Sequence, residues 1–171
     1  MLKFIGALCI LFSSVIFGFV WQERFERRVR EIRYLSHVLK WMESEIVFRK
    51  LPLLNICQKI KKEAPYPFDH FFDSLQEDLQ KGEEDLASIW LNNVMRYEKK
   101  WALKKEEIWL FKDIGQTLGK FNRTEQGKQF ALTQLHLEEQ ENEAFLEKQQ
   151  LKQLGVRVSL LFGLLFIILL I

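Results

Sequence analysis

Residues 28–48 read RVREIRYLSHVLKWMESEIVF, and the spacing of their apolar side chains indicates the fold class. These side chains recur every three or four residues, which places them on one face of an α-helix. The main stripe consists of Val29, Ile32, Leu35, Leu39, Met42 and Ile46. A neighbouring stripe consists of Tyr34, Val38, Trp41 and Phe48. Two adjacent stripes make the helix apolar over a broad arc, so we expect it to lie centrally in a helical bundle.

The residues after this helix keep the helical period, and nothing in them alternates like a strand. Pro52 suits the first turn of a second helix, and Pro65 and Pro67 separate that helix from a third. Gly82 is expected to close the third helix in left-handed geometry, and two more helices follow with a break near residues 99–104. The apolar faces of these four helices are Leu53, Ile56, Cys57 and Ile60; Phe68, Phe71, Phe72, Leu75 and Leu79; Leu86, Ile89, Trp90, Val94 and Tyr97; and Ile108, Phe111, Ile114 and Leu118.

The clearest turn in the chain lies in GQTLGKFNRTEQ at residues 115–126. Gly119 can stop the fifth helix in left-handed geometry. Asn122, followed by Glu125 three residues later, is typical of a helix N-cap with a reciprocal cap. No proline follows, so we expect a sixth helix to run from Arg123 toward the C-terminus.

Both ends of the chain are apolar, with no Asp, Glu, Lys, Arg or His in residues 4–21 or 158–171. About 18 helical residues span about 27 Å, close to the ~30 Å thickness of a bilayer core. The first stretch reaches this length. The second reaches it when counted from Leu154, because Arg157 can extend its guanidinium back to the head groups. The sequence therefore predicts an all-α bundle of about six helices, flanked by N- and C-terminal transmembrane helices.

Basic residues orient both spans, because Lys and Arg are enriched on the cytoplasmic side. We expect transmembrane helices at residues 1–21 and 154–171, and a cytoplasmic domain at residues 22–153, in the cell membrane. A cleaved signal peptide is the alternative for the first span, but no small-x-small cleavage site precedes the charged region. The arginines expected to set topology and to contact membrane lipids are Arg24, Arg27, Arg28, Arg30, Arg33 and Arg157.

Charge and composition narrow the class of function. The chain has 25 Lys and Arg against 23 Asp and Glu, and this net charge of +2 is not typical of a nucleic-acid-binding protein. His37, His70 and His136 are isolated, and no phosphate loop or nucleophile elbow occurs. Cys9 and Cys57 are expected to remain thiols in a reducing cytoplasm. We therefore expect no enzyme, no cofactor and no resident metal.

Two further patterns have competing interpretations. Glu139, Glu143 and Glu147 share a helix face that can in principle hold a hard cation, but no oxygen-rich loop accompanies them, which favours a solvated face. Small residues spaced four apart within the apolar ends let another helix approach closely and are candidates for intramembrane packing. They are Ser14, Gly18, Gly155, Ser159 and Gly163.

Several segments together resemble the stage III sporulation protein AB family of endospore-forming bacteria. The resemblance lies in MLKFIGA at residues 1–7, the stretch at 28–33, ESEI at 43–46 before Pro52-Leu53, GQTLG at 115–119, Asn122-Arg123, Gln126 and the acidic helix leading to the second span. It covers essentially the whole chain. Asp is common in that family where this chain has Asn122, and this difference keeps a cap but removes a charge.

The resemblance implies a non-enzymatic membrane component of a channel that links mother cell and forespore during engulfment. It places the central domain on the mother-cell side. That domain is similar to the helical domains of the inner-membrane platform protein of type II secretion and type IV pilus systems. By the same resemblance the partners are a secretion-type ATPase and other membrane proteins of the sporulation channel.

Within this hypothesis the segment at residues 115–126 is the candidate partner contact. Its candidate residues are Gly115, Thr117, Gly119, Asn122, Arg123 and Gln126. The competing interpretation is that Gly119 and Asn122 simply cap two helices. Unbroken helices next to both spans are expected to carry force. The alternative function is a membrane-tethered adaptor or sensor, whose basic flank reads anionic lipid and whose acidic helix recruits a soluble protein.

Overall fold

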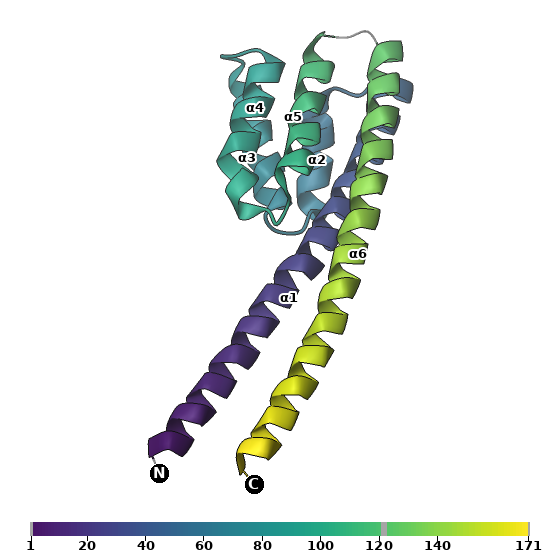
Figure 1. Ribbon diagram of the computed structural model, residues 1–171. Helices are drawn as coiled ribbons and strands as arrows, with labels where there is room; N and C mark the ends of the chain where they lie inside the picture. Colours follow the sequence, from purple (N-terminus) through teal and green to yellow (C-terminus); the bar gives the residue numbers. More distant parts are fainter. Residues whose placement is uncertain (1, 121–122, 171) are drawn as a thin grey trace. The chain divides into compact units, whose positions relative to one another are not determined.

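The computed structural model describes the backbone of residues 2–120 and 123–170, and the side chains of residues 23–118 and 125–151 (Figure 1). Within these residues all regular secondary structure is helical, which confirms the predicted all-α class. The six α-helices of the described chain are α1 Leu2–Glu43, α2 Leu53–Glu63, α3 Phe68–Lys81, α4 Leu86–Tyr97, α5 Lys105–Lys120 and α6 Arg123–Leu170. A π-helical segment, Ser44–Phe48, continues α1, and a short 3₁₀ segment, Glu98–Lys100, follows α4.

The chain divides into two compact units. The central unit is Arg30–Glu141, and the terminal unit combines Met1–Val29 with Asn142–Ile171. Among the described residues, no helix is both long enough and apolar enough to cross a membrane. The spans predicted at residues 1–21 and 154–171 lie outside the described side chains.

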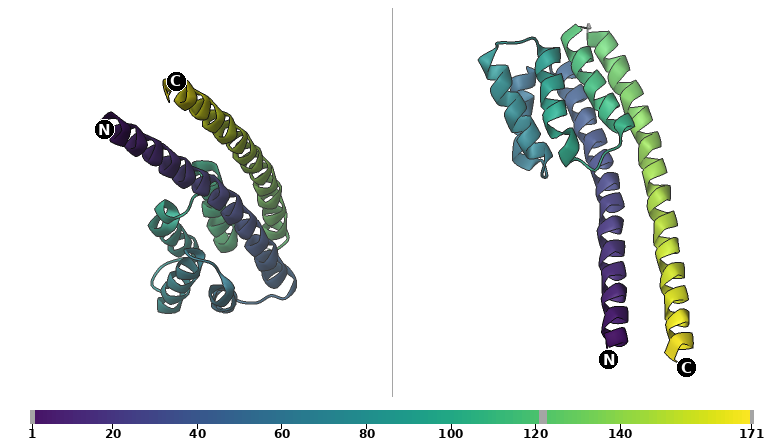
Figure 2. Two further views of the ribbon diagram at one scale, coloured as in Figure 1. Left: turned by 90° about the horizontal axis from the view of Figure 1, so that it is seen from below. Right: turned by 60° about the vertical axis from the view of Figure 1, so that its left-hand side comes forward.

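Within the central unit, each helix from α2 to α4 packs on the next along the chain (Figure 2). Their apolar faces meet in a core rich in aromatic rings. The ring of Phe71 lies 5.2 Å from that of Phe111, 5.5 Å from that of Trp101 and 5.6 Å from that of Trp90, measured between centroids. Edge-to-face and tilted pairs at such distances stabilise beyond the burial of area. The core side chains that the helical period predicted, including Ile32, Leu39, Ile56, Phe68, Phe72, Leu75, Val94 and Ile114, are 0% exposed.

Several predicted helix ends agree with the structure, whereas Pro52, predicted in the first turn of the second helix, is the cap before α2, which begins at Leu53. Gly82 ends α3 with φ of 65°, the left-handed geometry expected there. The break between α4 and α5 and the start of α6 at Arg123 are also as predicted. The prediction that α5 stops at Gly119 is wrong by one residue, since α5 runs to Lys120 and a glycine is tolerated in a last helical turn. The predicted cap Asn122 lies outside the described residues.

Buried carboxylates fix the loop between α4 and α5. Glu31 on α1 is 6% exposed, and its Oε2 accepts a hydrogen bond of 2.6 Å from the backbone N–H of Ala102. Glu107 in the first turn of α5 is fully buried and accepts from the backbone N–H of Lys104. The latter contact is one half of a capping box. The start of α5 is thereby tied to its own loop, and the loop is tied to α1.

The end of α1 departs from the predicted helical phase. The segment Ser44–Phe48 is π-helical, and the backbone N–H of Arg49 donates to the carbonyl of Ser44, five residues earlier. The wider turn rotates the following side chains relative to an α-helix. Glu45 is therefore buried at 3% exposed, whereas Phe48, predicted to lie on the apolar arc, is 75% exposed.

Candidate functional site

Gly115, the first residue of the predicted partner segment, is buried between α4 and α5. A Cβ atom at this position would lie 2.7 Å from the Cβ of Trp90, and closer still to the indole ring. The indole Nε1 of Trp90 donates a hydrogen bond of 2.8 Å to the carbonyl of Phe111. Glycine therefore allows the two helices to approach closely over a buried tryptophan. The helical period of the sequence predicts that Gly115 is buried, because it lies one turn after Phe111 on the apolar face of α5.

Two other residues of the predicted segment also contact their own chain. Thr117 is 1% exposed, and its hydroxyl donates to the carbonyl of Asp113 at 3.2 Å. Gln126 is 8% exposed, and its Nε2 donates to the carbonyl of Leu118 at 3.3 Å. The first contact lies within α5, and the second joins the end of α5 to the start of α6. Their burial favours a role in the fold, and contact with a partner stays a prediction. The remaining candidates Gly119, Asn122 and Arg123 lie outside the described side chains.

In the central unit, α1 and α6 are joined by polar pairs whose register is antiparallel. The Nη2 of Arg33 lies 2.7 Å from Oε1 of Glu141, and the Nε donates to the same oxygen at 2.9 Å. Lys40 pairs with Glu138 at 3.0 Å. Gln134 of α6 also donates a hydrogen bond of 2.8 Å to Glu43 of α1. Residue numbers rise along α1 as they fall along α6, so the basic face of one helix meets the acidic face of the other.

The terminal unit contains pairs of the same kind. Arg28 is 3% exposed, and its Nη1 donates to Oε2 of Glu147 at 2.6 Å. Lys148 lies 3.5 Å from the carboxylate of Glu26. The guanidinium of Arg28 is almost fully buried, and leaving its charge unpaired there would be destabilising. Its hydrogen bond to the carboxylate of Glu147 contributes to stability chiefly for this reason. Arg28 and Arg33, predicted to contact lipid, thus contact glutamates of α6.

Three more of the residues predicted to set topology or to pack in the membrane lie among the described side chains. Arg24 and Arg30 are exposed, and Arg27 is half-buried. Those outside the described side chains are Arg157, Ser14, Gly18, Gly155, Ser159 and Gly163.

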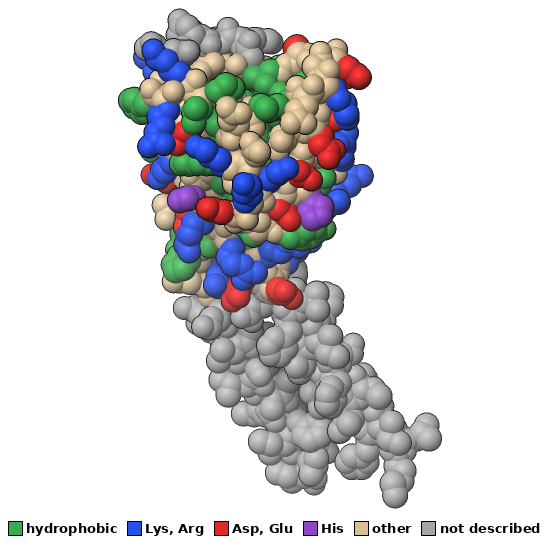
Figure 3. Space-filling view, turned by 180° about the vertical axis from the view of Figure 1, so that it is seen from behind, with side chains coloured by type: hydrophobic (Ala, Val, Ile, Leu, Met, Phe, Trp, Pro, Cys, Tyr) green, Lys and Arg blue, Asp and Glu red, His purple; other side chains and the backbone are tan. Residues whose placement is uncertain are grey.

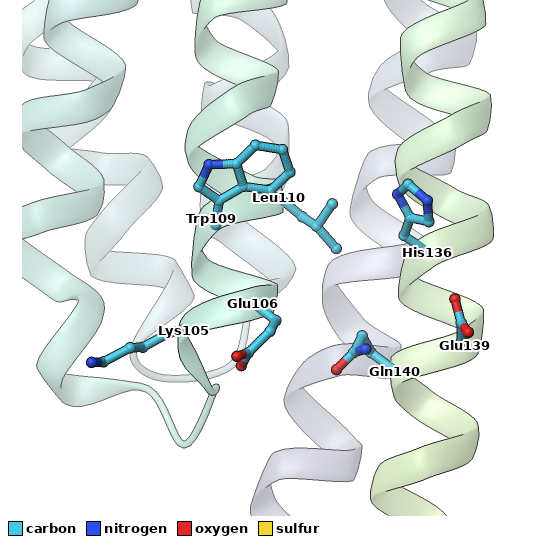
Figure 4. Close-up of a pocket in the computed structure, with 7 residues that line it drawn as sticks. All are labelled: Lys105, Glu106, Trp109, Leu110, His136, Glu139 and Gln140. Atoms are coloured by element: carbon cyan, nitrogen blue, oxygen red, sulfur yellow. The ribbon is translucent and has the colours of Figure 1, made fainter.

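A surface groove of about 540 Å³ lies between α5 and α6 in the central unit (Figure 4). Leu110, which is 7% exposed, reaches from α5 toward α6, while Trp109 beside it is 63% exposed. On α6, Leu132 and Leu135 are 52% and 61% exposed and precede the groove residue His136. The groove is lined by Lys105, Glu106, Trp109, Leu110, His136, Glu139 and Gln140. Its charged residues are of both signs, as are those on the opposite face of the molecule in Figure 3.

A second surface feature lies at residues 44–50, which we call the elbow because they join α1 to the segment before α2. The carboxylate of Glu45 is buried there. Its Oε1 accepts a hydrogen bond of 3.0 Å from Arg49, and its Oε2 has no hydrogen-bond partner but lies 4.0 Å from Nζ of Lys59. Lys50 has φ of 59°, a left-handed conformation that is uncommon outside glycine. The helical period alone does not reveal a π-helical turn, so the sequence does not predict the elbow.

The described titratable side chains do not converge on a reactive centre. Burial raises the pKa of the Cys57 thiol to about 12, so the thiol is protonated and unreactive near neutral pH. Glu139 and Glu143 are exposed, while Glu147 is paired with Arg28. Among the side chains that the structure describes, no cluster of three or more His, Cys, Asp or Glu is suited to hold a metal ion.

Comparisons with known proteins agree with one another. The family model described as stage III sporulation protein AB matches residues 3–171. Stage III sporulation protein AB of Bacillus subtilis (strain 168) is 31% identical over 170 residues, which are 99% of this chain and 99% of the relative. A solved structure of stage III sporulation protein AB (SpoIIIAB) has a TM-score of 0.69 at 31% identity and covers 72% of this chain and 98% of its own. The family predicted from the sequence is confirmed.

Proposed function

Because the chain belongs to the stage III sporulation protein AB family, we propose that it is a non-enzymatic membrane platform component of a sporulation channel between mother cell and forespore. The observation that carries this proposal is the extent of the match, which runs from residue 3 to residue 171 and includes both apolar ends. Its central domain would lie on the mother-cell side and dock soluble partners, among them a secretion-type ATPase of the same complex. Other membrane proteins of the channel would contact the spans.

The groove between α5 and α6 supports the docking part of the proposal. Partly exposed tryptophans over an apolar floor are frequent anchors of protein interfaces. Trp109 is 63% exposed above Leu110, and Leu132 and Leu135 extend the apolar surface along α6. Interfaces of this kind have a polar rim, which Lys105 and Glu139 provide here.

The same proposal gives α1 and α6 a mechanical role. Each is a single helix by its bounds, Leu2–Glu43 and Arg123–Leu170, and each includes residues of one predicted span. Helices without a break transmit displacement better than flexible linkers. We therefore also propose that movement of a bound ATPase reaches the membrane through α1 and α6.

Co-purification from membranes of sporulating cells tests the proposal. Tagged wild-type chain should capture a secretion-type ATPase, identified by mass spectrometry after cross-linking. Trp109→Ala should lower the captured amount at least fivefold, because the anchor is removed. Tyr66→Ala is the matched control, since Tyr66 is an aromatic residue that is 62% exposed elsewhere in the central unit. Failure of the wild-type chain to capture any such ATPase would reject the docking role.

The adaptor or sensor function has less support. That function needs the early arginines to be available to anionic lipid, whereas Arg28 is 3% exposed and paired with Glu147. Replacing Arg24, Arg27 and Arg30 by Gln separates the two functions, because a lipid sensor should lose its membrane distribution and a platform component should keep it.

A further inference from the structure

Unusual backbone and side-chain features coincide at the elbow, residues 44–50. Its first five residues are π-helical, and such turns are frequent at functional sites. Lys50 is the non-glycine residue with positive φ in the described backbone, at 59°. Phe48 is 75% exposed, more than any other large apolar side chain described. Conformations of this kind persist only where the surrounding structure holds them, and they concentrate at binding sites.

The neighbouring structure holds the elbow in place. The side chain of Val47 lies 3.8 Å from the position that a Cβ of Gly127 would occupy on α6. The backbone N–H of Leu51 donates to the carbonyl of Glu45 at 3.0 Å. Val47 thus packs inward on α6 while the next residue, Phe48, is left at the surface. An aromatic ring presented on a fixed backbone loses little freedom on binding.

Charged side chains at the elbow are held in place by a buried carboxylate. The buried carboxylate of Glu45 bonds Arg49 at 3.0 Å and attracts Lys59 at 4.0 Å, although both cationic side chains remain more than half exposed. Lys50 is also exposed. Two exposed cations, Arg49 and Lys50, therefore follow Phe48 in the chain, a third, Lys59, lies near Glu45, and the carboxylate of Glu45 is buried. A surface complementary to it has an apolar pocket with an acidic rim.

We infer that the elbow is a docking knob: Phe48 enters an apolar pocket of a soluble protein, and Arg49, Lys50 and Lys59 meet Asp and Glu side chains around that pocket. This inference rests on the proposed function, under which the soluble protein is the secretion-type ATPase. A protein fits better than a lipid surface, because Glu45 fixes the direction of Arg49 and fluid head groups require no fixed direction. One aromatic ring with three cations also falls short of the two strong signals that stable membrane attachment needs.

Direct binding measurements test the knob. The full chain is reconstituted in nanodiscs of uncharged phosphatidylcholine, and the dissociation constant for the purified ATPase is measured at low and high salt. Phe48→Ala and Lys50→Glu should each raise the dissociation constant at least tenfold. Tyr66→Ala and Lys99→Glu, at exposed positions outside the elbow, should stay within twofold of wild type. Lys50→Gly removes the charge and relieves the left-handed backbone, so weakened binding by this variant excludes misfolding as the cause.

The outcomes separate the knob from the wider proposal. If the wild-type chain binds the ATPase and both elbow variants bind it equally well, the docking role of the elbow is rejected and the proposed function stands. If the wild-type chain does not bind, both are wrong. A parallel arm measures association of the nanodiscs with vesicles of phosphatidylcholine and phosphatidylglycerol. Loss of that association in the elbow variants, with ATPase binding unchanged, would assign the elbow to anionic lipid and overturn the inference.

Discussion

Gly115 belongs to the segment predicted to contact a partner, and it is also required for the packing of two helices. It lies in the most distinctive segment of the sequence, yet its space is occupied by Trp90 of the neighbouring helix. Trp90 is 0% exposed and donates a hydrogen bond to the carbonyl of Phe111, so displacing it would break a buried hydrogen bond. The requirement for glycine at position 115 therefore follows from packing alone.

Substitution of Gly115 by Ala should destabilise the protein. The added methyl group either separates α4 from α5 or displaces Trp90, and overpacking of this kind costs about 1–3 kcal/mol. Thermal unfolding of the detergent-solubilised chain should show a lower midpoint, by about 2–4 °C for each kcal/mol.

Gly127→Ala is the matched control for this substitution. A Cβ at position 127 meets Val47 at 3.8 Å, an ordinary contact, and alanine raises helix propensity by about 1 kcal/mol. The control should therefore be neutral or stabilising. A Gly115→Ala variant as stable as the wild type would show that the α4–α5 approach is not fixed by this glycine.

Among the helices, the local sequence predicts where each helix lies in the chain better than it predicts which helix packs against which. The face of α3 illustrates the success, because Phe68, Phe71 and Leu75 share one helical face and are all 0% exposed. The π-helical turn illustrates the failure, since no local signal marks it and it leaves Phe48 exposed. Trp109 could have been found, because it is an aromatic residue that falls outside the apolar face of α5.

Pairing between α1 and α6 could not be predicted from either helix alone. The basic and acidic runs are evident in the sequence, but taken separately the first predicts a lipid-facing flank and the second a solvated face. Which residue meets which depends on the register of two helices about a hundred positions apart. That register is set by the whole bundle.

The α1–α6 register predicts the result of a charge exchange. Arg33→Glu alone places two carboxylates side by side and should lower the unfolding midpoint, whereas Arg33→Glu with Glu141→Arg should restore most of it. The coupling should be about 0.2–1 kcal/mol, because Arg33 is largely exposed, and it should fall as salt is added.

A double-mutant cycle on thermal unfolding of the solubilised chain measures this coupling. Arg33→Glu with Glu143→Arg is the control, because Glu143 lies two positions away on a different part of α6 and should not rescue stability. Equal rescue by both double variants would contradict the assigned register.

For the whole molecule, the proposed transmission of force can be tested by breaking α6 at one place. Seven Gly and Ser residues inserted after Gln150 interrupt the helix before the second predicted span, and we expect sporulation to fail while ATPase capture persists. Seven helix-forming residues at the same place are the control, because seven residues make almost two α-helical turns and restore the phase to within about 20°. The control variant should sporulate far better than the Gly-Ser variant, as measured by counts of heat-resistant spores. Equal sporulation by the two variants would mean that α6 only tethers the central domain, since both lengthen the chain equally and differ only in helical continuity.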